Sequence, residues 1–501
     1  MNLMMLLEMA TSGFGDRVAV KNEAASLTYS QLFAAAGAAA TQVKESGAGR
    51  MAVLDVSSLA VPVGLFSSAW AGVPYVPLNY RLTGDELDSL LGQIEPFYLV
   101  TDADRVTALG ERGDQTIVER EGFLAGLASV PARENDWAMD GDEIAILLFT
   151  SGTTGAPKAA VLRHKHLVSY ILGSVEFGAA SEDDAALVSV PPYHIAGMAA
   201  IMSSVYSGRR IVQLPNFSAD GWIDTARREG VTHAFVVPTM LARIVDALGD
   251  AAGAELPSLR ALSYGGGKMP QSVIERAMEL FPDTNFTNAY GLTETSSTIS
   301  VLGPDDHRAA VASDDAAVRR RIVSVGKALP SVEVEIRDEE GKRVGPGESG
   351  EIHVRGEQVS GEYLGRGSLV GSDGWFPTRD GGSMDDEGYI FVEGRIDDVI
   401  VRGGENLSPG EIEDTLLDHD AVADCAVVGV PDEQWGEAVA AVIVTGEGKT
   451  VTADELREFV KARLRSSRSP ARVEFWNELP YNETGKLLRR KVKAELVGEK
   501  S

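Results

Sequence analysis

Short apolar runs alternate with helix-like segments between Leu27 and about Asp250, and this alternation constrains the fold more than any other feature of the sequence. Strands buried on both faces of a parallel sheet read as continuous apolar runs, because helical crossovers cover both faces. The alternation therefore predicts an α/β core. The strand-like runs are RMAVLDV, PFYLVTD, EIAILLFT, AALVSVPP, RIVQLP and THAFVVPT, and the helix-like partners include YSQLFAAAGAAATQVKESG and GDELDSLLGQI.

The pattern changes twice in the last third of the chain. From about Val323, alternating strands flank a polar turn in SVEVEIRDEEGKRVGPGESGEIHVRG, which predicts antiparallel hairpins or a small β-barrel. After GRIDDVIVRGGENLSPGEIE, about a hundred residues hold a helix, two strand runs and the charged helix TADELREFVKARLRSS. These last residues are expected to form a separate, small α+β domain.

Composition narrows the class of protein. A formal net charge of -28 over 501 residues argues against a nucleic-acid surface. The single cysteine, Cys425, has no partner for an internal disulfide and suits a reducing cytoplasm.

The N-terminal apolar run is interrupted by Glu8 and has no preceding basic residue, so it predicts an amphipathic helix and not a signal peptide. The longest apolar region, 51–78, is too broken for a transmembrane segment.

A loop rich in glycine and hydroxyl groups follows one apolar run, in LLFTSGTTGAPKAAV. Its glycines let backbone N–H groups approach an anion, and its hydroxyls and lysine add donors and positive charge. It is not a Walker A loop, because Lys158 lies three positions after Gly155, not directly after it, and alanine follows the lysine where a hydroxyl residue is needed. The predicted phosphate-binding residues are Thr150, Ser151, Gly152, Thr153, Thr154, Gly155 and Lys158.

The full string of this loop resembles the signature loop of the adenylate-forming superfamily, which contains acyl-CoA synthetases, peptide-synthetase adenylation domains and luciferases. The resemblance extends from Leu27 to Lys491, with further motifs in the family's order. The segment GRIDDVIVRGGENLSPGEIE is especially similar to the hinge segment of 4-chlorobenzoate:CoA ligase and related short acyl- or aryl-CoA ligases. These further motifs are VPPYHIAGM, SYGGGKMP, NAYGLTET, DGWFPTRDGG, GYIFVEGRIDDVIVRGGENLSPGEIE and ELPYNETGKLLRRKV.

The resemblance implies a role for each nucleotide-site motif. Tyr290 would stack on adenine, Thr293 would bond the α-phosphate, and Glu294 would hold Mg²⁺. Asp380 would accept bonds from both ribose hydroxyls and Arg395 would contact the ribose, although Arg379 stands where the family usually has glycine. The remaining nucleotide-binding residues implied by the motifs are Gly265, Gly266, Gly267, Asn288, Ala289 and Gly291.

The resemblance also implies a mobile C-terminal domain. Lys486 matches the catalytic lysine, and Asp397 matches the residue about which the small domain rotates. The implied architecture is an α/β N-terminal domain (1–394) of stacked subdomains with a small β-barrel, a hinge (395–397), and a mobile α+β domain (398–501). The implied acyl and CoA channel residues are His194, Gly197, Met198, Gly403 and Gly404.

The function implied is an ATP-dependent ligation of a fatty or aryl monocarboxylic acid to CoA, with Mg²⁺, through an acyl-adenylate. Transfer to a carrier-protein phosphopantetheine in trans is the alternative. A nucleotide-binding regulator is disfavoured because Glu294, Asp380, Arg395 and Lys486 are all present. Whether the chain forms a homodimer is left open. The acyl pocket is expected near Pro191–Met198, Val236–Thr239, Ser263–Lys268 and Tyr290–Ser296, with Met269 as an adaptable liner and Lys268 as a candidate cation.

Overall fold

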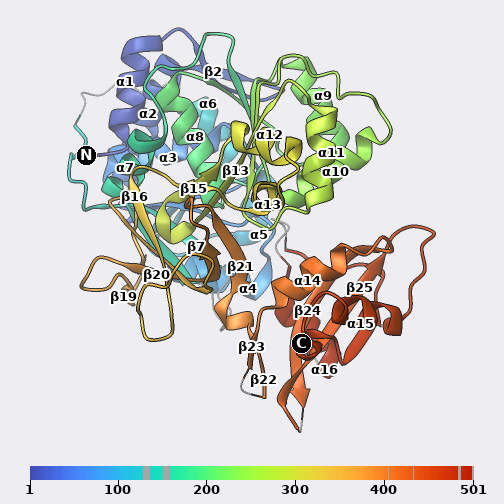
Figure 1. Cartoon of the computed structure of the whole chain (residues 1–501). Helices are drawn as coiled ribbons and strands as arrows, with labels where there is room; N and C mark the ends of the chain where they lie inside the picture. Colours follow the sequence, from blue (N-terminus) through green and yellow to red (C-terminus); the bar gives the residue numbers. More distant parts are fainter. Residues whose placement is uncertain (128–135, 151–157, 404, 433, 483–486, 499–501) are drawn as a thin grey trace. The chain divides into compact units, whose positions relative to one another are not determined.

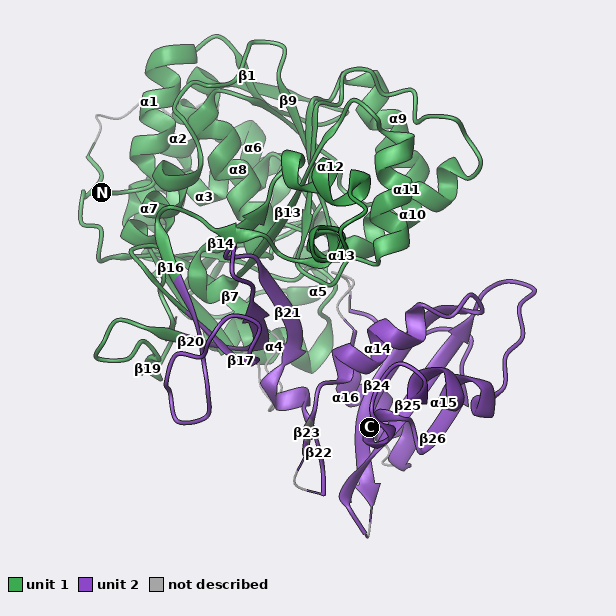
Figure 2. Cartoon of the chain, in the orientation of Figure 1, with its two compact units in different colours: residues 1–333, 354–376 green, residues 334–353, 377–501 purple. Residues whose placement is uncertain are grey.

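The computed structural model describes all residues except 128–135, 151–157, 404, 433, 483–486 and 499–501. Its internal contacts define two compact units, each described here by itself (Figure 2): unit 1 is Met1–Glu333 with Val354–Phe376, and unit 2 is Val334–His353 with Pro377–Ser501. The domain limits expected from the sequence, with a hinge at 395–397, stay a prediction.

Unit 1 contains two large sheets whose central strands are parallel, as the apolar runs predict (Figure 1). The nine-stranded sheet has the order β15-β14-β13-β12-β11-β9-β10-β1-β2 and is parallel from β13 to β1. The eight-stranded sheet has the order β19-β18-β8-β7-β4-β3-β5-β6 and is parallel from β7 to β6. The strands are β1 Val18–Lys21, β2 Ser26–Thr28, β3 Arg50–Leu54, β4 Tyr75–Pro77, β5 Phe97–Thr101, β6 Thr116–Glu119, β7 Ile144–Thr150, β8 Lys158–Arg163, β9 Ala185–Val188, β10 Arg210–Gln213, β11 His233–Val236, β12 Ala261–Gly265, β13 Asn285–Leu292, β14 Ser297–Leu302, β15 Lys327–Ala328, β18 Glu362–Tyr363 and β19 Gly367–Ser368.

Strand β3 explains why these runs are apolar without alternation. Met51 and Val53 join one hydrophobic core, whereas Ala52 and Leu54 join another on the opposite face. Successive strand residues point to opposite faces, so burial of both faces requires an uninterrupted apolar run.

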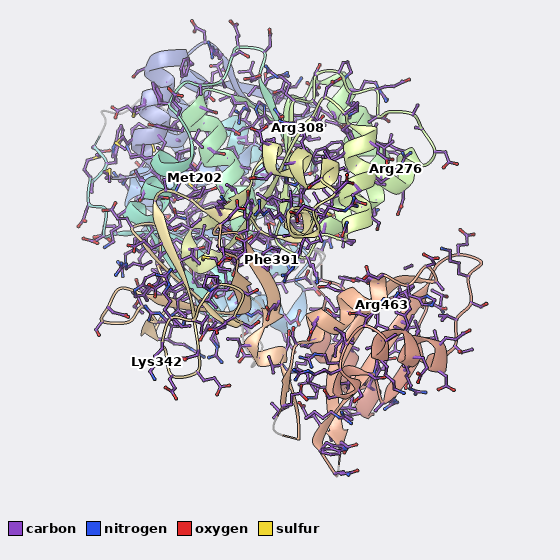
Figure 3. All side chains as sticks on the ribbon, in the orientation of Figure 1. Met202, Arg276, Arg308, Lys342, Phe391 and Arg463 are labelled. Atoms are coloured by element: carbon purple, nitrogen blue, oxygen red, sulfur yellow. The ribbon has the colours of Figure 1, made fainter. Side chains whose placement is uncertain are left out.

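Helices cover the faces of both sheets. The larger core gathers residues of α1, α2, α3, α7 and α8 with strand residues of both sheets, and Met202 on α8 is fully buried there, unlike the exposed Lys342 of unit 2 (Figure 3). Helices α9, α10 and α11 pack on the nine-stranded sheet, and α4 packs on the eight-stranded one. The helices of unit 1 are α1 Met4–Phe14, α2 Tyr29–Ser46, α3 Ala60–Ala71, α4 Gly84–Gly92, α5 Ala103–Leu109, α6 Arg120–Leu127, α7 His164–Ser174, α8 Ile195–Ser207, α9 Ala219–Arg228, α10 Pro238–Leu248, α11 Gln271–Leu280, η1 Thr293–Thr295, α12 Pro304–Ala312, α13 Ala316–Arg320 and η2 Arg321–Val323.

Local signals set the ends of the predicted helices. Helix α2 begins with a capping box between Thr28 and Gln31 and ends at Gly47, whose φ of 71° suits glycine. The predicted N-terminal helix is α1, and its apolar side is buried in the larger core. No helix in the described ranges has both the length and the apolar character needed to cross a bilayer.

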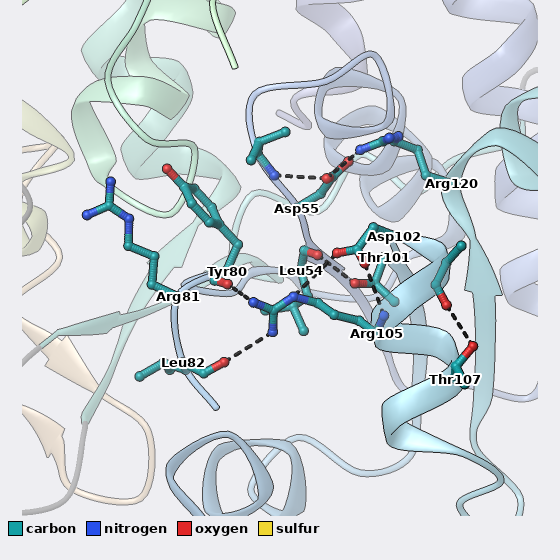
Figure 4. A network of polar contacts seen from close by, with 12 residues as sticks. Leu54, Asp55, Tyr80, Arg81, Leu82, Thr101, Asp102, Arg105, Thr107 and Arg120 are labelled. Carbon is teal, nitrogen blue, oxygen red and sulfur yellow. Dashed lines mark hydrogen bonds and ion pairs between the residues drawn. The ribbon is translucent and has the colours of Figure 1, made fainter. Parts of the chain in front are cut away.

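A polar network fixes the loop that follows β4 (Figure 4). The Arg105 guanidinium donates to the carbonyls of Tyr80 and Leu82 and forms an ion pair of 3.3 Å with Asp102. Because backbone carbonyls in a loop need partners when water is excluded, one guanidinium can hold the whole turn. The network thereby orients Tyr80, which belongs to an aromatic cluster described below.

Unit 2 contains most residues of a four-stranded sheet, β16-β17-β20-β21, and the whole of a five-stranded sheet in which β23-β22-β25-β24 are consecutive and β26 pairs with β25. On β24, Val427 packs with α14 and α15 while Val428 packs with α16, so this sheet is also covered on both faces. The prediction that the last hundred or so residues combine helices and strands in an α+β arrangement is confirmed. The elements are β16 Val332–Arg337, β17 Gly350–Gly356, β20 Phe376–Met384, β21 Ile390–Arg395, η3 Ile396–Asp398, β22 Ile400–Arg402, β23 Glu405–Leu407, α14 Pro409–Leu417, β24 Val422–Asp432, β25 Gly436–Thr445, α15 Ala453–Lys461, η4 Ser466–Arg468, β26 Arg472–Phe475 and α16 Arg489–Val497.

Candidate active site

A tight turn at the end of β13 presents Glu294 in unit 1. Strand β13 leads into the 3₁₀ turn η1, where Thr293 and Glu294 are both half-buried. A Cβ added to Gly291 would lie 1.8 Å from the Ser297 carbonyl oxygen, so only glycine permits this approach of β13 to β14. The turn therefore depends on the glycine of the NAYGLTET motif.

The Glu294 carboxylate suits a divalent cation. The Tyr363 hydroxyl donates to Oε1 of Glu294, and no lysine or arginine in the described part of the chain neutralises this carboxylate. The described residues include no group of three or more His, Cys, Asp or Glu side chains arranged to hold a metal ion. Mg²⁺ is commonly held by one or two carboxylates together with substrate phosphates and water, and a single unneutralised glutamate fits that mode.

The ends of the predicted phosphate loop lie side by side. Thr150 ends β7, Lys158 begins β8, and these two residues are partners in the antiparallel pair. The Thr150 hydroxyl donates to the Lys158 carbonyl at 3.4 Å, and both residues are half-buried. Ser151, Gly152, Thr153, Thr154 and Gly155 lie outside the described residues, so their predicted contacts stay predictions.

The predicted glycine wall begins where β12 ends. Gly265 pairs with Ala289 of β13, and a Cβ at Gly265 would lie 2.1 Å from the Ala289 carbonyl oxygen. Gly266 has a φ of 82°, and Gly267 is exposed. The first glycine thus allows close packing of strands, whereas the second provides the left-handed turn that leaves the sheet.

Two members of the NAYGLTET motif have different surroundings. Asn288 is buried, and its amide donates to the Ser324 carbonyl at 3.0 Å, so its side chain holds the neighbouring segment. Tyr290 is half-buried on β13 opposite Ser300 of β14. The Tyr290 side chain is therefore better placed than that of Asn288 to contact a nucleotide directly, because it is only half-buried.

His194 occupies the N-cap position of α8 within an aromatic cluster. Its ring centroid lies 4.4 Å from that of Tyr193, which in turn lies 5.5 Å from Tyr80. Burial lowers the pKa of His194 to about 4, so the imidazole is neutral at pH 7. Its Nε2 is buried without a hydrogen-bond partner among the described residues.

The two other predicted channel residues beside His194 lie deeper. A Cβ at Gly197 would lie 2.8 Å from the Pro191 carbonyl oxygen, which explains a glycine in the first turn of α8. Met198 is fully buried in the larger hydrophobic core. In this structure Met198 therefore packs the helix and is not exposed.

In unit 2, β20 and β21 bring Asp380 and Arg395 together. These residues are partners in the antiparallel pair and form an ion pair of 2.8 Å. The same Nη1 of Arg395 donates to the Thr378 carbonyl at 3.1 Å. Asp380 is buried, so its carboxylate is held in one orientation next to a permanent positive charge.

Arg379 has a backbone conformation that glycine adopts readily and arginine rarely. Its φ is 63°, in the left-handed region, and its N–H donates to Glu351 at 3.0 Å. Its guanidinium forms an ion pair of 2.6 Å with Asp397, the predicted hinge residue in η3. The substitution therefore adds an ion pair to the predicted hinge.

The predicted CoA-facing glycine, Gly403, packs against an aromatic ring. A Cβ there would lie 2.7 Å from the Trp435 ring, and the Gly403 N–H donates to the Trp435 carbonyl at 2.7 Å. Gly404 and Lys486 lie outside the described residues. Tyr481 and Leu487, both of which are described, form an antiparallel bridge.

Three contacts of the predicted site residues could not be identified from the sequence: Tyr363 with Glu294, Trp435 with Gly403, and the guanidinium of Arg379 with Asp397. Only Arg379 carried a signal, since it departs from the glycine of the resembled motif. The other two are far in sequence from the residues that they contact.

Comparisons with known proteins identify similar sequences and structures over almost the whole chain. Residues 7–364 match the AMP-binding enzyme family, and residues 411–486 match the AMP-binding enzyme C-terminal domain. A fatty acid–[acyl-carrier-protein] ligase of Streptomyces coeruleorubidus is 33% identical over 96% of this chain and 94% of its own. A feruloyl-CoA synthase of Amycolatopsis sp is 33% identical over 95% of each chain. An o-succinylbenzoate CoA synthetase of Bacillus subtilis, solved with the acyl-adenylate OSB-AMP, is 30% identical over 97% of each chain with a TM-score of 0.83. It has also been solved with ATP and a magnesium ion (29% identity, TM-score 0.83, 97% of this chain and 99% of its own).

Proposed function

The chain belongs to the AMP-binding enzyme family, and from this premise we propose that it is an ATP-dependent carboxylic acid:CoA ligase. It would activate a fatty or aryl monocarboxylic acid as an acyl-adenylate and then transfer the acyl group to CoA. The observation that carries the proposal is Glu294, an unneutralised carboxylate on a glycine-dependent turn, in a chain aligned almost end to end with acid ligases.

In the first reaction, a carboxylate oxygen attacks the α-phosphorus of ATP and the bond to pyrophosphate breaks. Two anions must meet, so catalysis consists mainly of positioning and charge neutralisation. The loop from Thr150 to Lys158 would hold the departing phosphates, and Thr293 would donate to the α-phosphate. Bound at Glu294, Mg²⁺ would neutralise phosphate charge.

Unit 2 would supply the ribose and lysine contacts of the same reaction. Asp380 has its carboxylate oriented by Arg395, and a carboxylate accepts two hydroxyl donors well. Lys486 would approach the reacting carboxylate and the ribose oxygens. Tyr290 would stack on adenine beside the wall begun by Gly265.

In the second reaction, the thiol sulfur of CoA attacks the acyl carbonyl, the thiol loses its proton, and the bond to AMP breaks. Lys486 should be distant at this stage. We propose that rotation about Asp397 removes Lys486 and presents Gly403 and Gly404 to the pantetheine. The neutral imidazole of His194, with its Nε2 unpartnered among the described residues, suits a position between the acyl and thiol groups.

A carrier-protein phosphopantetheine in trans is a second candidate acceptor. The relative from Streptomyces coeruleorubidus, named as a fatty acid–[acyl-carrier-protein] ligase, favours it. AMP release in the presence of CoA, compared with release in the presence of a panel of carrier proteins, separates the two acceptors. Faster release with any carrier than with saturating CoA would contradict the CoA ligase.

The acid itself is tested by a pyrophosphate-release screen over fatty, aryl and alicyclic acids. Turnover with at least one of them is expected, and its absence for every class would contradict the proposal.

Use of ATP and CoA together with a single cysteine favours a cytoplasmic protein. Static light scattering tests whether it is a homodimer.

A further inference from the structure

The turn that carries Glu294 is followed by strained backbone. Ser296 and Ser297 have φ values of 58° and 113°, in a region that residues other than glycine rarely adopt. Such conformations cost on the order of 1–3 kcal/mol each and persist only where the surroundings enforce them. The turn therefore needs an external support.

That support is the segment from Gln358 to Tyr363, named here the clamp segment. The N–H groups of Ser360 and Gly361 donate to the Glu294 carbonyl at 2.8 and 3.0 Å. The buried amide of Gln358 donates to the carbonyl of Thr295 at 3.1 Å and to that of Thr298 at 2.8 Å. The backbone of the turn is thus held at Glu294 itself and at two of the residues that follow it.

The other edge of the clamp segment is joined to the strand that leaves the phosphate loop. Strand β18 pairs with β8, and Glu362 forms a two-bond ion pair with Arg163 at 2.9 and 2.7 Å. Bidentate pairs of this kind restrict geometry as well as adding energy. The clamp segment therefore connects the phosphate-loop strand to the Glu294 turn within unit 1.

The side chain of Glu294 receives its own contact from this segment. The Tyr363 hydroxyl donates to Oε1. A phenol is a neutral donor, so it orients the carboxylate and leaves its negative charge for a cation, whereas an arginine or lysine would cancel that charge. We propose that Tyr363 is a positioning residue that aims the Glu294 carboxylate at the metal ion of the adenylation reaction. This inference depends on the proposed function, in which Glu294 is the metal ligand.

Electron paramagnetic resonance with Mn²⁺ in the presence of ATP tests the inference on the full-length protein. Tyr363→Phe should weaken Mn²⁺ binding about tenfold or more, because partners of metal ligands typically contribute 10–100-fold to metal affinity. The Mg²⁺ concentration for half-maximal pyrophosphate release should rise in parallel. Thioester formation from supplied acyl-adenylate should be unchanged.

The matched control is Tyr98→Phe, which removes a hydroxyl bonded to Gln42 at 2.8 Å elsewhere in unit 1 and should leave Mn²⁺ affinity at the wild-type value. Wild-type Mn²⁺ affinity in Tyr363→Phe, with weakened affinity in Glu294→Gln, would overturn the role of Tyr363 alone. Wild-type affinity in both variants would overturn the metal assignment of Glu294 itself. Thermal melting of each variant separates loss of binding from loss of folding.

Discussion

Glu294 and Asp397 are both predicted to be essential carboxylates, yet their surroundings are opposite. Glu294 lies on a turn whose next two residues are fully buried and which the clamp segment holds through backbone and side-chain bonds. Asp397 is 43% exposed, and its ion pair is with Arg379, which is 52% exposed. A group that stabilises charge developing in the transition state must already be oriented before the reaction. A hinge residue must instead be able to change its backbone angles without breaking strong contacts.

Typical magnitudes support this contrast. Each hydrogen bond of the clamp segment contributes roughly 0.5–1.5 kcal/mol, so disrupting the Glu294 turn costs several kcal/mol. An exposed ion pair contributes only about 0–1 kcal/mol. The Arg379–Asp397 pair can therefore define a resting position without preventing movement.

The largest effect is expected for Lys486→Ala, which tests whether the two regions serve different half-reactions. Loss of a charge close to the transition state should reduce adenylate formation by about 10²–10³-fold or more. Thioester formation from supplied acyl-adenylate should be largely retained. The two rates are measured separately, by pyrophosphate release and by loss of free thiol, and equal losses would contradict the alternation.

Asp397→Pro should produce the opposite pattern with a smaller magnitude. Proline removes the backbone freedom on which a rotation would depend, so thioester formation should fall by about 10²-fold because the small domain is misplaced. Pyrophosphate release should be near wild type. If this variant makes thioester from acyl-adenylate at the wild-type rate, Asp397 is not the hinge.

Acid should destabilise unit 1 selectively. Burial lowers the pKa of His164, His166, His194 and His233 to about 4, and lowers that of His307, and all five belong to unit 1. Their stabilising contribution is complete above the unfolded pKa of about 6.5. It is lost as pH falls from there towards 4, because these histidines become protonated in the unfolded chain while they stay neutral in the folded chain.

A fully buried histidine of this kind should contribute a loss of roughly 2 kcal/mol between pH 6.5 and 4.5. Urea unfolding at both pH values, followed by hydrogen exchange of peptides from each unit, measures the effect. Equal destabilisation of both units would contradict the assignment to these histidines.

The smallest effect is expected for Arg379→Gly. The change removes an ion pair worth about 0–1 kcal/mol and relieves a left-handed φ that costs on the order of 1 kcal/mol, so the free energy of unfolding should hardly change. Any dependence of the thioester rate on salt that arises from this pair should disappear.

Arg379→Ala is the matched variant, since it loses the pair but keeps the strained φ. It should lose the same salt dependence and be slightly less stable than Arg379→Gly. Stopped-flow rates over a range of ionic strength give the comparison. Persistence of the wild-type salt dependence in both variants would exclude the pair as its source.

Much of the fold was predictable because its signals are local. Uninterrupted apolar runs such as RMAVLDV became parallel strands, and the segment after Thr28 became α2 through a capping box. The assignment of Asn288 to the nucleotide came from its motif alone and stays a prediction, and the motif gave no sign that its buried amide donates to the Ser324 carbonyl. Tyr363 was not predicted, because nothing within a few residues of it marks a partner 69 positions away.

The sequence by itself determined the α/β class, the family and the residue types that the chemistry requires, since these depend on periodicity and on contiguous motifs. Tertiary structure alone decided which of these residues are held and which are exposed. It paired Tyr363 with Glu294 and Arg379 with Asp397. The physical reason is that orientation, desolvation and strain arise from contacts between segments distant in the chain, whereas a motif specifies only neighbours along it.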